Sequence, residues 1–131
     1  MYVGRTGTAM NYEIFDGLNS LQLLDFEVHS FESQRDGSTD VLTIRGSRNF
    51  AYYHNAEIRF SGVEYCELPT RFSHAHFRAA SIEETEALRR RVEFEGSVFS
   101  IVEERDSDFE RVRVVVAAAV EVLLETVQYL R

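Results

Sequence analysis

The sequence predicts an α+β fold: a mainly antiparallel, twisted sheet of six to eight strands, open or curled into a half-barrel, with one or two short helices packed on it. Three observations lead to this fold. Several short segments alternate apolar and polar residues with a period of two, as strands with one buried face do. Short turns join them, without the long crossovers that parallel strands require. Residues 81–91 carry the clearest helix signal.

The first residues differ from the rest of the chain. Residues 1–10 contain two glycines and two threonines and show no apolar period, so we expect a flexible tail followed by a single domain over residues 11–131. Met10 is an alternative first residue, which the sequence leaves open. Asn11 is a candidate N-cap for a first helix, and Gly17 predicts that this helix is short.

The middle of the chain carries the strand patterns. The Asp36-Gly37 pair predicts a hairpin turn between the first two strands, and residues 46–49 predict the next turn. Gly62 predicts a bulge or bend, and Pro69 ends the extended stretch because it has no N–H to donate. The predicted strands are 23–29, 41–45, 56–61, 63–68 and 74–79.

The predicted helix over 81–91 has matching signals at both ends. Ser81 and Glu84 have the spacing of a capping box, in which each side chain bonds the backbone N–H of the other. Glutamates fill the first turns and Arg89, Arg90 and Arg91 the last, as the helix dipole favours. Because its apolar positions are few, we expect this helix on the surface of the sheet.

The C-terminal third predicts further strands. Residues 92–95 and 98–102 flank Gly96-Ser97, which has the composition of a two-residue hairpin turn. The Val-rich segment that follows fits a period of two and also a helical stripe. Because β-branched residues favour strands, we predict a strand over 109–118. Residues 119–131 stay open between strand and helix, with strand favoured to about residue 126.

The net charge of the chain limits the classes of partner that we expect it to bind. Its 131 residues include 22 acidic and 14 basic side chains, for a net charge of −8, and every basic residue is arginine. Such a surface repels nucleic-acid phosphates and attracts basic proteins. The longest apolar run, Val114 to Val120, has seven residues, well below the roughly 20 that a membrane-spanning helix needs. We therefore expect a cytoplasmic protein that binds neither nucleic acid nor membrane.

One histidine pair is a candidate metal site. On a strand, His74 and His76 point to the same side, so both imidazoles would reach one ion. A third ligand is needed, and Asp25, Glu27 or His29 on another strand would supply it, as would His54 or Glu67. The alternative interpretation is two polar residues on the wet face of a strand.

The other motifs of catalysis are missing from the sequence. No Gly-x-Ser-x-Gly elbow and no phosphate-binding glycine loop occurs. The single cysteine, Cys66, has acidic neighbours in the sequence and no nearby cation to activate it, so we interpret it as a core residue. We therefore predict no catalytic residue and no cofactor.

These observations favour a non-enzymatic protein-binding module that recognises a basic protein partner. Inhibitors and the immunity proteins that neutralise bacterial toxins share this profile, as an analogy of class rather than of motif. In this hypothesis carboxylates steer the approach of the partner and two tyrosines anchor it. The steering residues are Asp25, Glu27, Glu57, Glu64 and Glu67, and the anchors are Tyr52 and Tyr53.

Two alternative hypotheses stay open beside the protein-binding module. One is a metal-dependent or acid–base enzyme, or a small-ligand-binding protein, that uses His74 and His76. The other is a homodimer, compatible with the first hypothesis, in which the Val-rich C-terminal strand forms an exposed sheet edge that pairs with a second copy.

Overall fold

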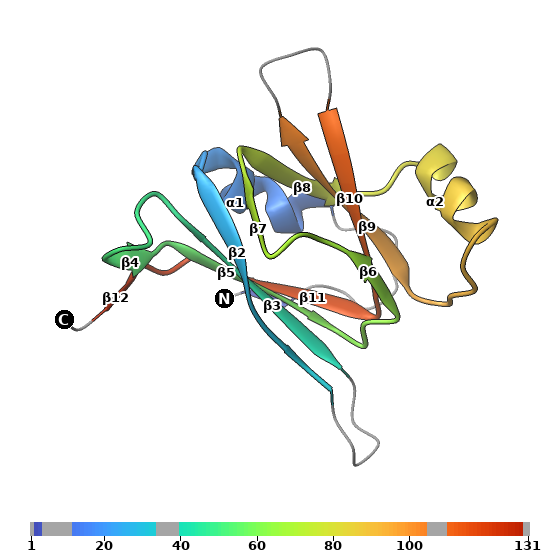
Figure 1. Ribbon diagram of the computed structural model, residues 1–131, viewed down its shortest axis with the longest axis horizontal. Coiled ribbons are helices and arrows are strands. Elements are labelled where there is room, and N and C mark those ends of the chain that lie inside the picture. The colour runs from blue at the N-terminus through green and yellow to red at the C-terminus, as the bar shows by residue number, and fades with distance from the viewer. Residues whose placement is uncertain (1, 4–11, 34–39, 105–109, 130–131) are drawn as a thin grey trace.

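The computed structural model describes residues 2–3, 12–33, 40–104 and 110–129 (Figure 1). The helices are a 3₁₀ turn, η1 (Tyr12–Phe15), continued by α1 (Asp16–Ser20), and α2 (Ile82–Arg89). The strands are β1 (Tyr2–Val3), β2 (Asp25–Glu32), β3 (Val41–Ser47), β4 (Tyr53–His54), β5 (Ala56–Ser61), β6 (Tyr65–Glu67), β7 (Arg71–Ser73), β8 (Ala75–Ala79), β9 (Ser97–Glu104), β10 (Glu110–Ala117), β11 (Ala119–Leu123) and β12 (Val127–Gln128).

The strands form antiparallel sheets that stay open. One sheet has six strands in the order β1-β11-β5-β3-β2-β7, and a second has four in the order β6-β10-β9-β8. A third, small sheet pairs β12 with β4. The prediction of an α+β fold with a mainly antiparallel sheet and two short helices is confirmed. The sequence missed that the strands divide between two main sheets.

A bent ribbon of two paired strands joins these two sheets. β5 pairs with β11 in the six-stranded sheet, and β6, the next strand after β5, pairs with β10 in the four-stranded sheet. The bend lies at Gly62 and Ala118, where Ala118 N donates to Ser61 O at 3.0 Å and to Gly62 O at 3.2 Å. Gly62 has φ +65°, and a Cβ there would lie 2.8 Å from the Cβ of Ala118. Only glycine therefore fits this bend without strain.

Phenylalanines from both sheets fill the space between them. Phe26 stacks on Phe72 with ring centroids 5.4 Å apart, and Phe77 of the four-stranded sheet lies at the same distance from Phe26. Phe60 and Phe99 make a further contact across the core at 5.4 Å. These rings are buried, and each contributes roughly 2–3 kcal/mol by removing apolar surface from water. One core thus holds the two sheets together.

Three local predictions were wrong. Residues 92–95 form no strand, and β9 pairs instead with β8 and β10, so Gly96-Ser97 is not a hairpin turn. Gly46 and Ser47 belong to β3 rather than to a turn. The predicted Asp36-Gly37 turn lies outside the described residues, although β2 and β3 pair as a hairpin requires.

The ends of the chain also differ from expectation. Tyr2 and Val3 of the expected tail pair with β11, while residues 1 and 4–10 lie outside the described residues. The Val-rich segment is strand in both halves, as β10 and β11. It is not a sheet edge, because β10 lies between β6 and β9 and β11 lies between β1 and β5. The predicted edge is therefore covered where β6 pairs with residues 114–116 and β1 with residues 121–122, and the homodimer itself stays a prediction.

The edge of the four-stranded sheet at β8 is capped by a side chain. Asn19, in the last turn of α1, donates from Nδ2 to Phe77 O at 2.9 Å and accepts from Phe77 N through Oδ1 at 2.9 Å. Its amide thus makes the two bonds that a neighbouring strand would make. This arrangement protects the edge from pairing with another chain.

We predict that Asn19→Ala lowers the free energy of unfolding by about 1–2 kcal/mol, because two hydrogen bonds are lost and the Phe77 backbone groups are uncovered. Self-association should increase as well, since β8 then offers a free edge. Urea unfolding and sedimentation velocity measure the two effects. Ser20→Ala is the control, since its hydroxyl bonds only the exposed Asp16 O. Equal stability and equal mass for the two variants would contradict a capping role.

Helix α2 is fixed on the four-stranded sheet through Glu84. Its carboxylate accepts two bonds from the Arg78 guanidinium, at 2.7 and 2.9 Å, and one from Ser100 Oγ at 3.0 Å. It also accepts from Ser81 N at 2.9 Å, and Ser81 Oγ accepts from Glu84 N, so the predicted capping box is present. Hydrogen bonding to Arg78 above all holds the pKa of Glu84 at about 2, against the opposing effect of burial.

We predict that Glu84→Gln lowers the free energy of unfolding by about 2 kcal/mol at neutral pH, since a charge-assisted pair is replaced by neutral bonds. Because the folded pKa of Glu84 lies below its ordinary value of 4.5, its contribution is complete above pH 4.5 and is lost as pH falls toward 2. Urea unfolding across this range should show the difference between variant and wild type shrinking. Glu86→Gln, on the exposed side of α2, is the control. A pH-independent difference would refute the assignment.

Candidate functional site

The residues predicted to bind a partner fall into separate regions. Asp25, Glu27 and Glu57 lie on the six-stranded sheet, whereas Glu64 and Glu67 lie at β6, in the four-stranded sheet. The predicted anchors Tyr52 and Tyr53 lie at β4 and the turn before it. Figure 1 shows the β4–β12 pair and α2 at opposite ends of the molecule. No single contact surface of ordinary size joins all seven residues.

Arginines lie beside two of the acidic residues of the six-stranded sheet that were predicted to steer a partner. On the face opposite the core, Glu57 Oε2 lies 2.6 Å from Arg59 Nη2, and Glu57 Oε1 lies 3.3 Å from Arg45 Nε. Arg71 Nη2 lies 3.6 Å from Glu27 Oε2. Two of the four glutamates that were predicted to steer a basic partner are thus paired within the chain. Asp25 accepts a bond from Ser73 Oγ at 3.2 Å and lies at the rim.

Glu57 is the centre of this charge network. Its side chain is only 12% exposed. Burial alone raises the pKa of a carboxyl, but the nearby charges and hydrogen bonds of Arg59 and Arg45 outweigh it and lower the pKa of Glu57. Glu57 therefore stays ionised, and its charge is taken up by ion pairs within the sheet. Little of its electrostatic field is left to attract a partner.

The turn before β4 and the β4–β12 pair expose one tyrosine and bury one histidine. Tyr52 is 61% exposed, and its carbonyl accepts from Tyr129 N at 2.8 Å. His54 is 4% exposed, and its Nδ1 lies 3.0 Å from the hydroxyl of Tyr129. Burial first, and then the charge of Arg45, lowers the pKa of His54. His54 thus fixes the C-terminal strand and is not a spare metal ligand.

The histidine pair does not lie on one strand. His74 precedes β8 and has φ +50°, whereas His76 lies within β8. The rule that residues i and i+2 share a strand face therefore does not apply, and this premise of the predicted metal site is wrong. The two histidines do line one hollow of about 330 Å³ with Glu104, whose Oε1 lies 3.8 Å from His76 Nδ1. In the described residues, no three His, Cys, Asp or Glu side chains are placed to hold a metal ion.

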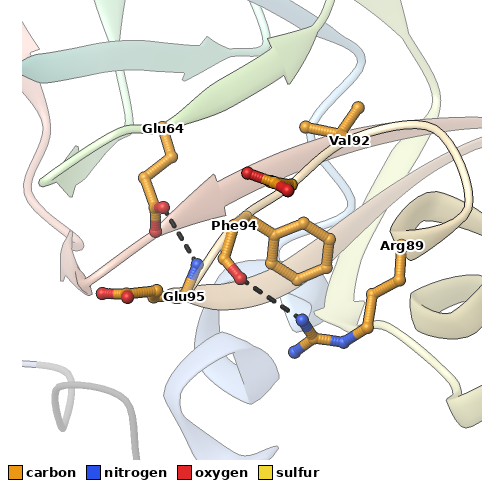
Figure 2. A pocket seen from close by; sticks show the side chains of 6 residues that line it. Glu64, Arg89, Val92, Phe94 and Glu95 are labelled. Carbon is orange, nitrogen blue, oxygen red and sulfur yellow. Dashed lines mark hydrogen bonds between the residues drawn. The ribbon is translucent and has the colours of Figure 1, made fainter.

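A larger hollow of about 560 Å³ lies between α2 and the start of β6 (Figure 2). It is open to solvent and has an apolar part and a charged part. Val92 and Phe94 form the apolar part and pack into a small second core with Leu88. The charged side chains that line it are Glu64, Glu93, Glu95 and Arg89. Three carboxylates against one guanidinium leave the hollow negative.

The carboxylate of Glu64 is held in place by the backbone on the other side of the hollow. Its Oε1 accepts from Glu95 N at 3.0 Å and its Oε2 from Gly96 N at 2.5 Å. A Cβ on Gly96 would lie 2.6 Å from Glu64 Oε2 and 2.8 Å from Ala117 O, so this close approach requires glycine. Each oxygen keeps a lone pair for a further donor. Glu64 is therefore a preorganised acceptor on the surface.

The neighbouring acidic residue, Glu67, is different. Its Oε1 lies 3.4 Å from Arg91 Nη2, and both side chains are about half exposed, so this pair is a weak surface contact. Cys66 lies between Glu64 and Glu67 in the sequence. It is half-buried against the main core, and burial raises the pKa of its thiol. The hollow thus takes its fixed negative charge from Glu64 rather than from Glu67.

Sequence reasoning missed Glu93 and Glu95, although the signal was present. The alternation Val-Glu-Phe-Glu over 92–95 separates buried Phe94 from the two exposed glutamates. Such alternation normally indicates a strand. Here the segment pairs with no strand, and its apolar residues pack with Leu88 of α2 in the small second core.

The comparisons with known proteins add no relative: no family model, no curated protein and no solved structure matches this chain. No helix in the described part of the chain has the length and apolar character needed to cross a membrane.

We predict that Gly96→Ala lowers the free energy of unfolding by about 1–3 kcal/mol, because the added methyl meets the Ala117 carbonyl and pushes Glu64 away. Gly17→Ala is the matched control: its new methyl would meet only the end of the Leu124 side chain, which can move. Thermal unfolding of both variants measures the difference. Equal melting temperatures would show that the loop at Glu64 is not tightly held.

Proposed function

We propose that this chain is a non-enzymatic protein-binding module that recognises a basic protein partner, in the manner of inhibitors and toxin-immunity proteins, and that the hollow between α2 and β6 is its contact site. The observation that carries this proposal is that three carboxylates, of which Glu64 is held by backbone N–H groups, gather around the partly exposed Val92 and the largely buried Phe94 in one hollow. Glu64, Glu93 and Glu95 surround Val92 and Phe94, with a single guanidinium among them.

The distribution of charge favours this hollow over the six-stranded sheet. On the sheet, Glu27 and Glu57 each have an arginine within 4 Å. In the hollow, Glu93 and Glu95 have no ion pair among the described residues, and Glu64 bonds only backbone N–H groups. A net charge of −8 draws a basic protein from a distance, and an unpaired patch then orients it.

The proposal changes the roles given to the predicted residues. Glu64 keeps its role as a contact, and Glu67 lies beside it with part of its charge compensated by Arg91. Tyr52 and Tyr53 lie at the other end of the molecule from α2, so the anchor of the partner passes to Val92 and Phe94. A small apolar centre inside a polar rim is the usual anatomy of a protein contact.

We predict that Glu93→Gln together with Glu95→Gln weakens binding of the basic partner about tenfold or more, because two rim carboxylates lose their charge. Glu86→Gln with Glu125→Gln is the matched control, since both residues are exposed, lie outside the hollow and give the same change in net charge. Each immobilised variant is incubated with a cell extract, and the retained basic protein is purified and titrated at low and high salt.

The expected result is a basic protein that binds wild type and the control pair alike, binds the rim pair weakly, and dissociates as salt rises. A protein held equally by the rim pair and the control pair would place the contact elsewhere. If no basic protein is retained by wild type at low salt, the proposed function is wrong.

A further inference from the structure

We propose that the guanidinium of Arg89 occupies, in the free chain, the place that an arginine side chain of the partner takes in the complex. This inference rests on the proposed function and names the chemistry that the hollow recognises. It also gives Arg89 a regulatory role, as an internal competitor that the partner displaces.

The position of Arg89 indicates which group the hollow accepts. Its Cζ lies 4.3 Å from the centre of the Phe94 ring, within the range of a cation–π contact. Its Nη1 donates to Phe94 O at 3.2 Å. Figure 2 shows Arg89 reaching from α2 toward this carbonyl, while Glu64 reaches from the opposite side toward the backbone of Glu95. A planar cation thus has an aromatic face, a carbonyl acceptor and carboxylates around it.

Arg89 is held loosely in this place. Among the described residues Arg89 forms no ion pair within 4 Å, and its one side-chain hydrogen bond goes to Phe94 O. A guanidinium has five N–H groups, so most of its donors still face water. An arginine of the partner is not tethered to the end of α2. Its guanidinium can therefore stack on the Phe94 ring and donate hydrogen bonds to the Phe94 carbonyl and to Glu64 at the same time.

The geometry favours arginine over lysine as the partner's cation. A guanidinium is planar, stacks on an aromatic face and donates in several directions, whereas an ammonium is a compact and strongly hydrated charge. The hollow offers one flat ring and acceptors that lie apart, on Phe94 and on Glu64. A flat group with several donors suits this combination better than an ammonium group does.

The proposed competition between Arg89 and an arginine of the partner predicts a specific change in affinity. If Arg89 occupies the place of the ligand, its removal frees the ring and the carbonyl, so affinity for an arginine peptide rises by more than the loss of one positive charge explains. Arg90 supplies the control for charge, because it is exposed, adjacent in the helix and outside the hollow. The relevant quantity is therefore the difference between the two variants.

The test uses Arg89→Gln and Arg90→Gln with two probes, tetra-arginine and tetra-lysine peptides, titrated by calorimetry and by amide NMR shifts at fixed ionic strength. We expect Arg89→Gln to bind tetra-arginine about threefold to tenfold more tightly than Arg90→Gln does. The two variants should bind tetra-lysine with nearly equal affinity. Shifts on adding tetra-arginine should centre on residues 92–96 and Glu64.

Two outcomes overturn the inference. Equal affinity of the two variants for tetra-arginine would mean that only overall charge matters, and weaker binding by Arg89→Gln would make Arg89 part of the contact rather than its competitor. Thermal unfolding of both variants checks the fold, and Arg89→Lys, which keeps the charge and loses the flat group, repeats the comparison. The Glu93 and Glu95 variants test the proposed function separately, so the displacement can fail while the acidic contact stands.

Discussion

The rest of the structure depends on the bend of one two-stranded ribbon at Gly62 and Ala118. Because both strands bend together, the ribbon keeps its hydrogen bonds while it passes from the six-stranded to the four-stranded sheet. The two sheets can then face each other across one core of phenylalanines. A straight ribbon would leave each sheet with an uncovered apolar face, which a chain of this size has no other element to bury.

The hollow is a consequence of how α2 is placed on the second sheet. Glu84 ties the start of the helix to Arg78 and Ser100, and Leu88 packs into the small core near its end. The chain must then return from α2 to β9 around the start of β6. It does so as a segment that pairs with no strand, whose apolar residues pack with Leu88 of α2 and whose glutamates are exposed. The carboxylate of Glu64 fixes the end of that segment.

Net charge and local charge play different roles in this protein. The total of −8 follows from composition, and it sets the long-range field that a basic partner meets. Where that field is available depends on which carboxylates have arginines beside them. On the six-stranded sheet the register aligns Glu27 with Arg45 and Arg45 with Glu57, so opposite charges cancel across strands. At the hollow, segments outside the strands place the carboxylates of Glu64, Glu93 and Glu95, and these carboxylates have no ion pair among the described residues.

The sequence by itself determined the α+β class, the α2 capping box and strand β5, since these depend on periods and spacings within a few residues. The tertiary structure decided the features that depend on contacts between residues far apart in the sequence. Residues 92–95 alternate like a strand yet pair with nothing, and His74 adopts a left-handed conformation just before the strand it was expected to join. Glu57 forms ion pairs, and Glu93 forms none among the described residues. Both outcomes depend on strand register and helix docking, which bring together residues far apart in the chain.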